Sequence, residues 1–168
     1  MYVKGTVYEI YDEYAVEESY EQSGSKRTNE RVTAHYYVIP LADSFETDTP
    51  QYITLKAGHK DIIPKAERLM QQTWNYYDYD IQPEQWAEFE IVGEVTPLED
   101  DLISYLYEWF MYGDDMATRA DYEPYICPYK ITYHDVGSHT TTILLFAGMA
   151  VVGAVGLGVM VFVYLKHR

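Results

Sequence analysis

The segment AEFEIVGEVTPLEDDLISYLYEWFMYG, residues 87–113, holds the two patterns that decide the fold. Its first part alternates, with Phe89, Ile91 and Val95 on one side and glutamates on the other. A strand with one apolar and one charged face is typical of an antiparallel sheet that covers a core on one side. Gly93 falls on the inner face, where it allows a bulge or a sharp bend.

The second part of this segment predicts an amphipathic helix. Thr96 and Glu99 have the spacing of a capping box, and Pro97 suits the first helical position. Apolar residues then recur on one face, and Gly113 offers a left-handed end. The predicted face consists of Leu98, Leu102, Tyr105, Leu106 and Trp109.

Strand-prone stretches rich in Val, Ile, Thr and Tyr lie before this segment, near residues 3–16, 31–41 and 51–56. Because residues 23–25 read Ser-Gly-Ser, we expect the first two stretches to form a long hairpin. The third is a short strand that ends before Gly58.

A last strand is predicted over residues 124–133, with the inward side chains Tyr125, Cys127, Tyr129, Ile131 and Tyr133. Pro124 and Pro128 favour a position at the edge of the sheet, since proline has no N–H for the ladder.

Residues 61–77 predict another amphipathic helix, with apolar side chains at three- and four-residue spacing. Asp61 is its expected cap, and Pro64 falls in the first turn, where the missing N–H costs nothing. The stretch YYDYDIQPEQ, residues 76–85, reads as a loop.

This order of elements predicts an α+β fold: a small antiparallel β-barrel or OB-like sheet with two helices, followed by one C-terminal transmembrane helix. Five short strands with a helix after the third match the wiring of an oligonucleotide/oligosaccharide-binding barrel with one added helix. A split α+β sandwich fits the same order and stays open as an alternative.

The C-terminal run from Ile143 to Leu165 contains no charged residue, Asn, Gln, Ser or Thr. As a helix it reaches about 34 Å, which is enough to cross a hydrocarbon core of about 30 Å. The predicted organisation is an acidic soluble domain (1–135), a connector (136–142), a transmembrane helix (143–165) and a basic tail (166–168).

Small residues recur within the predicted span at Gly148, Ala150, Ala154 and Gly158. Because small side chains let two helix backbones approach closely, we expect self-association or pairing with another membrane helix.

The composition excludes some partners. All 27 acidic residues precede Ile143 and ten of the 12 Lys and Arg do, so residues 1–142 carry 10 − 27 = −17. Such a domain is repelled by phosphates, and nucleic acid is not an expected partner. Tyrosine is abundant, with 19 copies, and its ring and hydroxyl suit binding surfaces.

Motifs for catalysis are absent: the chain has no phosphate-binding glycine loop, no His-Glu-x-x-His and no Gly-x-Ser-x-Gly. No cofactor and no metal are predicted. His134, Asp135 and His139 read as a solvated connector, Cys127 as a buried inert thiol, and His35 as a hydrogen-bonded residue rather than a catalytic base.

The predicted contact for a partner is the cluster Tyr76, Tyr77, Asp78, Tyr79 and Asp80, where rings and negative charge gather. The hypothesis is a membrane-anchored, non-enzymatic interaction or scaffold domain that binds a basic protein partner within a membrane assembly. The alternatives are a membrane-bound hydrolase that uses paired carboxylates and a domain that only spaces a larger assembly.

At GTVYEIYDEY (5–14), TAHYYVIPL (33–41) and FEIVGEVTPLEDDLISYLYEWF (89–110), the chain resembles a group of uncharacterised bacterial membrane proteins. In these proteins a small β-barrel-like domain sits beside a transmembrane helix. The resemblance implies a bacterial cell membrane and no established activity.

Orientation follows from charge. Lys166 and Arg168 after the span favour a cytoplasmic C-terminus and an extracytoplasmic domain. This arrangement requires an upstream membrane segment, which the resembling proteins have, because residues 1–30 contain no signal-peptide region. A tail anchor with a cytoplasmic domain is the alternative.

Overall fold

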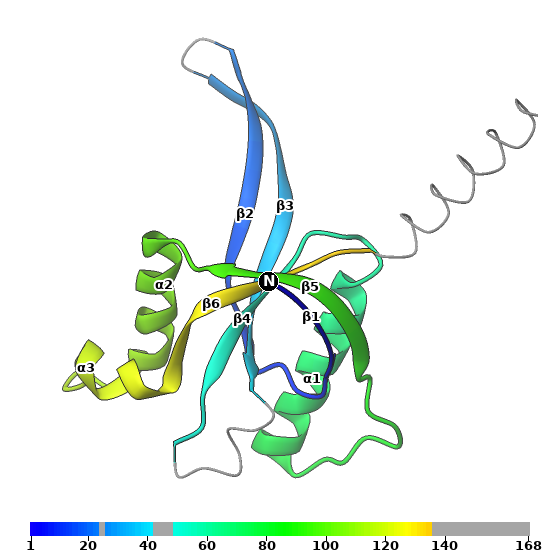
Figure 1. Cartoon of the computed structure of the whole chain (residues 1–168), viewed down its shortest axis with the longest axis vertical. Helices are drawn as coiled ribbons and strands as arrows, with labels where there is room; N and C mark the ends of the chain where they lie inside the picture. Colours follow the sequence, from blue (N-terminus) through cyan, green and yellow to red (C-terminus); the bar gives the residue numbers. More distant parts are fainter. Residues whose placement is uncertain (24–25, 42–48, 136–168) are drawn as a thin grey trace, which may run out of the picture. The chain divides into compact units, whose positions relative to one another are not determined.

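The computed structural model describes residues 1–23, 26–41 and 49–135, and residues 1–134 form one compact unit. The unit has an α+β fold, as predicted, with six strands in the order β1-β5-β6-β4-β3-β2 (Figure 1). The elements are β1 (Tyr2–Val7), β2 (Asp12–Ser23), β3 (Lys26–Pro40), β4 (Tyr52–Ala57), α1 (Ile63–Tyr79), β5 (Phe89–Pro97), α2 (Asp100–Met111), α3 (Arg119–Tyr122), the 3-10 helix η2 (Glu123–Tyr125) and β6 (Ile126–Tyr133).

The sheet is mixed, because β4 and β6 run parallel while the other neighbours run antiparallel. The prediction of a purely antiparallel sheet is therefore wrong for this pair. The edge position predicted for residues 124–133 is also wrong, since β6 lies between β5 and β4. The β4–β6 register shifts between Tyr52 and Thr54, opposite the stretch of β6 that holds Pro128, and this irregularity accommodates proline inside the sheet.

The predicted strand over residues 3–16 is broken into β1 and β2, which lie at opposite edges of the sheet. The break follows from the burial of Ile10, whose side chain is 0 % exposed. Its backbone N–H donates to Thr73 Oγ1 of α1 at 3.4 Å, and the N–H of Tyr11 donates to the carbonyl of Val38 at 2.9 Å. These contacts are tertiary, so local strand propensity does not reveal them.

This short connection forces the sheet to curl. From Val7 to Asp12 the chain takes five residue steps, which span at most about 18 Å when fully extended. The two edges of a flat sheet of six strands lie about 24 Å apart at a strand spacing of about 4.8 Å. The edges must therefore approach one another, and the strands curve as Figure 1 shows.

The curled sheet is not closed: among the described strands, β1 and β2 are not hydrogen-bonded neighbours. The predicted barrel is therefore wrong, and the OB-like topology finds no support in this strand order. The short connection draws the two edge strands, β1 and β2, toward one another. The sheet therefore curls like part of a barrel although it stays open.

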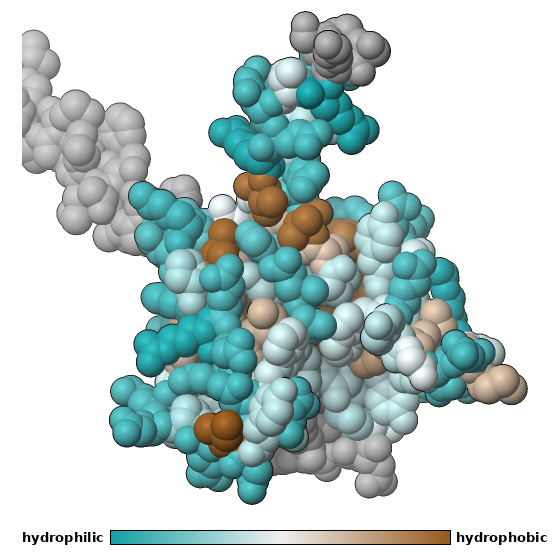
Figure 2. Space-filling model, turned by 180° about the vertical axis from the view of Figure 1, so that it is seen from behind, coloured by the Kyte–Doolittle hydropathy of each residue, from teal (hydrophilic) through white to brown (hydrophobic). Residues whose placement is uncertain are grey.

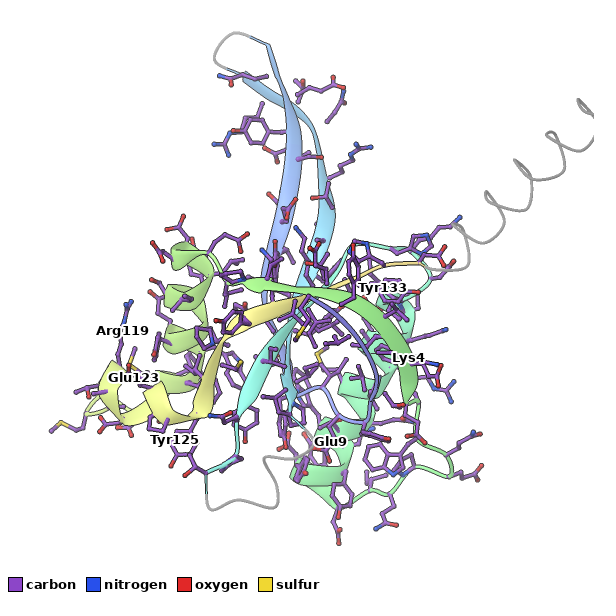
Figure 3. The ribbon with its side chains drawn as sticks, in the orientation of Figure 1. Lys4, Glu9, Arg119, Glu123, Tyr125 and Tyr133 are labelled. Atoms are coloured by element: carbon purple, nitrogen blue, oxygen red, sulfur yellow. The ribbon has the colours of Figure 1, made fainter. Side chains whose placement is uncertain are left out.

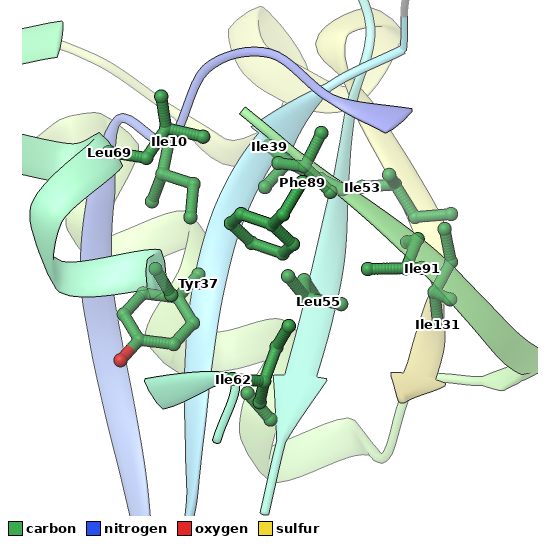
Figure 4. Close-up of a cluster of buried hydrophobic side chains, with 13 residues drawn as sticks. Ile10, Tyr37, Ile39, Ile53, Leu55, Ile62, Leu69, Phe89, Ile91 and Ile131 are labelled. Atoms are coloured by element: carbon green, nitrogen blue, oxygen red, sulfur yellow. The ribbon is translucent and has the colours of Figure 1, made fainter. Parts of the chain in front are cut away.

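Two apolar cores lie on opposite faces of the sheet. In β3, Tyr37 and Ile39 join the core under α1, whereas Val38 between them joins the core under α2. Figure 4 shows the first core, in which Ile62 and Leu69 meet the inner side chains of the strands. The second core is smaller and consists of Val38, Leu98, Leu106 and Ile126 with aromatic rings around it.

Helix α1 differs from its prediction at both ends. Ile62 occupies the cap position without a side-chain hydrogen bond, so the predicted Asp61 cap is wrong, while Pro64 does lie in the first turn. The helix continues to Tyr79, and the loop predicted from residue 76 is therefore wrong for its first four residues. Ring contacts with Tyr11 and Trp86 stabilise the last turn, and these are invisible to local propensity.

Helix α2 begins at Asp100, and the predicted capping box is wrong. Thr96 and Pro97 end β5 instead, where they pair with β6. The carboxylate of Glu99 accepts a hydrogen bond from Lys130 Nζ, whose residue is only 6 % exposed in β6. This bond to Lys130 lowers the pKa of Glu99. Gly113 has φ 87°, which confirms the predicted left-handed end.

Part of the hairpin stands away from the sheet. β3 pairs with β4 only from His35 onward, while β2 and β3 pair with each other as far as Ser23 and Lys26. The predicted long hairpin is thus confirmed. Figure 2 shows a hydrophilic arm with apolar side chains near its base, and Val16 and Val32 in this region are 44 % and 46 % exposed.

Among the described residues, no helix combines the length and the apolar character needed to cross a membrane. The predicted connector 136–142, span 143–165 and tail 166–168 lie outside the described residues.

We predict that Gly93→Ala destabilises the domain. A Cβ at Gly93 would lie 2.5 Å from Ile131 Cγ2 and 2.7 Å from the carbonyl oxygen of Thr132. Relieving such an overlap costs about 1–3 kcal/mol. Chemical denaturation of the full chain measures the cost. The matched control is Gly5→Ala in β1, where no atom lies within 4 Å of the new Cβ; equal midpoints for both variants would contradict the proposed close approach.

Candidate functional site

A pocket of about 330 Å³ lies beside the end of α1. The connection between β1 and β2, the last turns of α1 and the segment between α1 and β5 line it. Figure 3 labels Glu9 at this end of the molecule. The lining residues, called the aromatic pocket below, are Tyr8, Glu9, Tyr76, Gln82, Trp86 and Glu88.

Glu9 is held by two tyrosines. Its Oε2 accepts a hydrogen bond from the hydroxyl of Tyr11 at 3.1 Å, and its Oε1 accepts one from the hydroxyl of Tyr77 at 3.1 Å. The two rings stack with their centroids 5.9 Å apart. Burial is the main cause that raises the pKa of Tyr11 and of Tyr77. Both hydroxyls therefore stay protonated at neutral pH and donate to the carboxylate.

The rings around Glu9 form a connected set. Tyr76 contacts Trp86 edge-on at 5.8 Å and Tyr77 edge-on at 5.1 Å between centroids. Tyr8, from the connection, is 55 % exposed. Behind the pocket, the indole N–H of Trp74 donates to the carbonyl of Tyr11, which joins α1 to the connection. The aromatic rings therefore have defined positions before any ligand arrives.

This set of groups suits a cation. Aromatic faces attract ammonium and guanidinium groups through the ring quadrupole, and carboxylates add a direct charge interaction. Glu9 and Glu88 supply that charge, and among the described residues that line the pocket there is no Lys or Arg. A lysine or arginine side chain, or another organic cation of that size, is the chemical class that fits.

The structure brings only part of the predicted contact cluster to this pocket. Tyr76 lines it, and Tyr77 lies behind it on Glu9. Asp78, Tyr79 and Asp80 are exposed at the helix end and do not line it. Asp80 is in the left-handed conformation, with φ 53°.

Sequence reasoning missed Tyr8, Glu9, Trp86 and Glu88. Tyr8 and Glu9 lay within a predicted strand, and their distance of nearly 70 residues from Tyr76 concealed the contact. Trp86 was the available signal, since a tryptophan next to a polar loop usually packs against something.

Two other predicted residues have defined surroundings. His35 Nδ1 lies 2.6 Å from Glu13 Oε2, and its ring stacks on Tyr37 with centroids 6.0 Å apart, so the predicted hydrogen-bonded role is confirmed. Cys127 is half-buried, and burial raises the pKa of its thiol. A raised pKa favours the unreactive thiol form.

The remaining candidates fall elsewhere. Within residues 1–23, 26–41 and 49–135, no three His, Cys, Asp or Glu side chains gather as metal ligands. His139 and the predicted pairing face Gly148, Ala150, Ala154 and Gly158 lie outside the described residues.

The fold and the pocket together define an α+β domain with a curled, open sheet and an aromatic, acidic pocket at the end of α1. The family model described as Domain of unknown function (DUF8577) matches residues 1–166, so the chain belongs to this family. Comparisons with curated proteins and with solved structures found no match.

We predict that Tyr11→Phe destabilises the domain, because it removes the hydroxyl that binds Glu9. A hydrogen bond to a charged group contributes about 1.5–3 kcal/mol to stability. Because Tyr11 and Glu9 are both partly exposed, we expect the loss of unfolding free energy to lie near the lower end of this range. Chemical denaturation of the full chain measures it. Tyr79→Phe, at a side chain that is 71 % exposed, is the control and should change little. Similar losses in both variants would show that Tyr11 does not hold Glu9.

Proposed function

We propose that this protein is a membrane-anchored, non-enzymatic interaction domain whose aromatic pocket binds a lysine or arginine side chain of a basic protein partner. One observation carries the proposal: Glu9, which lines the aromatic pocket, is fixed by hydrogen bonds from the hydroxyls of Tyr11 and Tyr77. A carboxylate positioned in advance loses little freedom when a cation arrives, which favours binding.

The energy of one such contact is modest. A cation over an aromatic ring contributes about 0.5–2 kcal/mol, and an exposed ion pair adds about 0.2–1 kcal/mol. A single side chain therefore gives weak affinity, so the partner needs a basic segment that also meets Asp78 and Asp80 at the same helix end. A membrane tether increases the effective concentration of the domain and makes weak contacts sufficient.

Charge also favours a basic partner. The formal net charge of the chain is −15. Glu88 lines the pocket, and Asp78, Asp80 and Glu84 are close in sequence to residues that line it. Like-signed groups around a site steer cations toward it, and salt weakens the attraction. Weaker binding at high salt is therefore expected for a charged contact, and it distinguishes this proposal from binding through apolar contacts.

The hydrolase alternative requires two carboxylates that exchange protons with a substrate. The carboxylates that line the pocket are Glu9 and Glu88. Both oxygens of Glu9 accept hydrogen bonds from tyrosine hydroxyls, so the carboxylate is held in place as an acceptor. A carboxylate held in this way is suited to attract a cation, so we place binding ahead of hydrolysis.

The membrane part of the proposal rests on sequence. The charge-free run 143–165 supports a single membrane span, and Lys166 and Arg168 support a cytoplasmic C-terminus with the domain outside. Gly148, Ala150, Ala154 and Gly158 support self-association or pairing with another span, so that the domain joins a membrane assembly as a scaffold.

We predict that the full chain binds a lysine-rich peptide and that Glu9→Gln weakens this binding about fivefold, which corresponds to about 1 kcal/mol. Trp86→Ala should cause a similar loss, because it removes a ring from the pocket. Fluorescence anisotropy of a labelled peptide measures the affinity at low and at high salt.

The matched control variant for this binding is Tyr112→Ala, whose side chain is 92 % exposed and outside the pocket. A peptide with glutamine in place of lysine controls for charge. Undiminished binding by Glu9→Gln, or equal binding of the glutamine peptide, would refute the cation site.

We predict that protease added to intact cells digests the domain, because the proposed orientation places it outside the cytoplasm. Arg27 and Arg31 on the exposed β2–β3 arm offer trypsin sites. A C-terminal tag should be spared until the membrane is permeabilised. Digestion of the domain only after permeabilisation would instead support the tail-anchored arrangement.

A further inference from the structure

A larger pocket, of about 620 Å³, adjoins the aromatic pocket along α1. It lies between the first turns of α1 and the chain that leads into β5. Because Trp86 and Glu88 line both pockets, one groove continues from the end of α1 toward its beginning. The part of this groove near the beginning of α1, called the basic end below, is lined by Lys65 and Arg68.

The position of the two cations on the helix directs their side chains to this groove. Gln72 lies four residues after Arg68 and seven after Lys65, so the three side chains share one side of α1. On this side the Gln72 amide holds the neighbouring segment. Its Nε2 donates to the carbonyl of Gln85 at 3.0 Å, and its Oε1 accepts from the N–H of Ala87 at 2.7 Å. The wall opposite the cations is therefore fixed on α1.

The two cations of the basic end have no partner in the part of the chain that the structure describes. Within residues 1–23, 26–41 and 49–135, neither forms an ion pair or a side-chain hydrogen bond. Of the carboxylates that line this end, Glu90 pairs with Lys4 at 3.1 Å, and Glu88 stands at the boundary with the aromatic pocket. The charge of the groove thus reverses along α1, from Glu9 at one end to two unpaired cations at the other.

We infer that the partner of the aromatic pocket carries an acidic residue about four residues from its bound lysine or arginine, and that Lys65 and Arg68 bind this carboxylate. The inference rests on the proposed function and specifies the partner's sequence. Arg68 lies eight residues before Tyr76, or about 12 Å along the helix at about 1.5 Å per residue. An extended peptide covers this distance in about four residues of about 3.3 Å each. Lysine and arginine form charge-assisted hydrogen bonds with carboxylates.

The overall charge of the chain has the opposite effect on such a peptide. The formal net charge is −15, so an added acidic residue weakens the attraction of a peptide when only the general field acts. A direct contact with Lys65 and Arg68 strengthens binding instead. The sign of the change on adding one acidic residue therefore separates a specific contact from general attraction.

The experiment uses the purified full chain in detergent and the labelled lysine-rich peptide of the binding test above. Unlabelled Gly/Ser peptides with one lysine compete with the label, and anisotropy gives their inhibition constants. One competitor has glutamate four residues after the lysine and another has it four residues before, so that both directions along α1 are covered. Glutamine replaces the glutamate in the controls, and all peptides are acetylated and amidated. We expect the better glutamate peptide to bind about two- to fivefold more tightly than its control, the range for an exposed ion pair.

The variants Lys65→Gln and Arg68→Gln test where the carboxylate binds. Each should remove most of the gain of the glutamate peptide over its glutamine control, because each removes one of the two cations. The matched control is Lys60→Gln, at an exposed lysine that lines neither pocket. It changes the net charge by the same amount and should preserve the gain. A peptide with glutamate directly after the lysine should gain nothing, because its carboxylate does not reach the basic end.

Equal inhibition by the glutamate and glutamine peptides would overturn the inference and leave the cation site in place. A gain that survives in both variants would overturn it as well, because the carboxylate would then bind elsewhere. Failure of all one-lysine peptides to displace the label would also overturn it. In that case the effect of Glu9→Gln on binding of the label shows whether the proposed cation site falls too.

Discussion

The length of the connection between β1 and β2 constrains the whole domain. Residues 8–11 link strands at the two outer edges of a six-stranded sheet. A flat sheet is wider than this connection can reach, and curling is the remaining solution. The burial of Ile10 against Thr73 fastens the connection to α1, so the curl is supported by packing as well as by chain length.

The aromatic pocket arises from this connection. Tyr8 and Glu9 belong to it and meet Tyr76 and Trp86 because the connection passes the end of α1. The curl that it imposes also brings β1 over the inner face of the sheet, where Val3 and Ile91 line an apolar hollow.

The other face of the sheet depends on one buried charge. Lys130 lies in the central strand β6 and is 6 % exposed, and a buried ammonium requires an anionic partner. Glu99 supplies the carboxylate from the turn that follows β5. Because Glu99 is engaged in this way, Thr96 and Pro97 belong to β5, and α2 begins only at Asp100. Local capping preferences are worth about 1 kcal/mol, which is less than the cost of leaving the buried Lys130 ammonium without a partner.

The sequence by itself determined the α+β class, most of the buried face of both long helices and the inward face of β5, because each depends on periodicity. The predicted helix faces were too wide, since Tyr77 and Tyr105 are 54 % and 52 % exposed. Only the tertiary structure decided the break after Val7, the central place of β6 and the meeting of Glu9 with Tyr77. These depend on contacts between residues far apart in the chain. A signal was present at the break, since Val7 and Ile10 are both apolar at a spacing that cannot share one face of a strand. Strand order and ring contacts leave no such local pattern, because hydrogen bonding between strands and packing between helix ends are set by the whole fold.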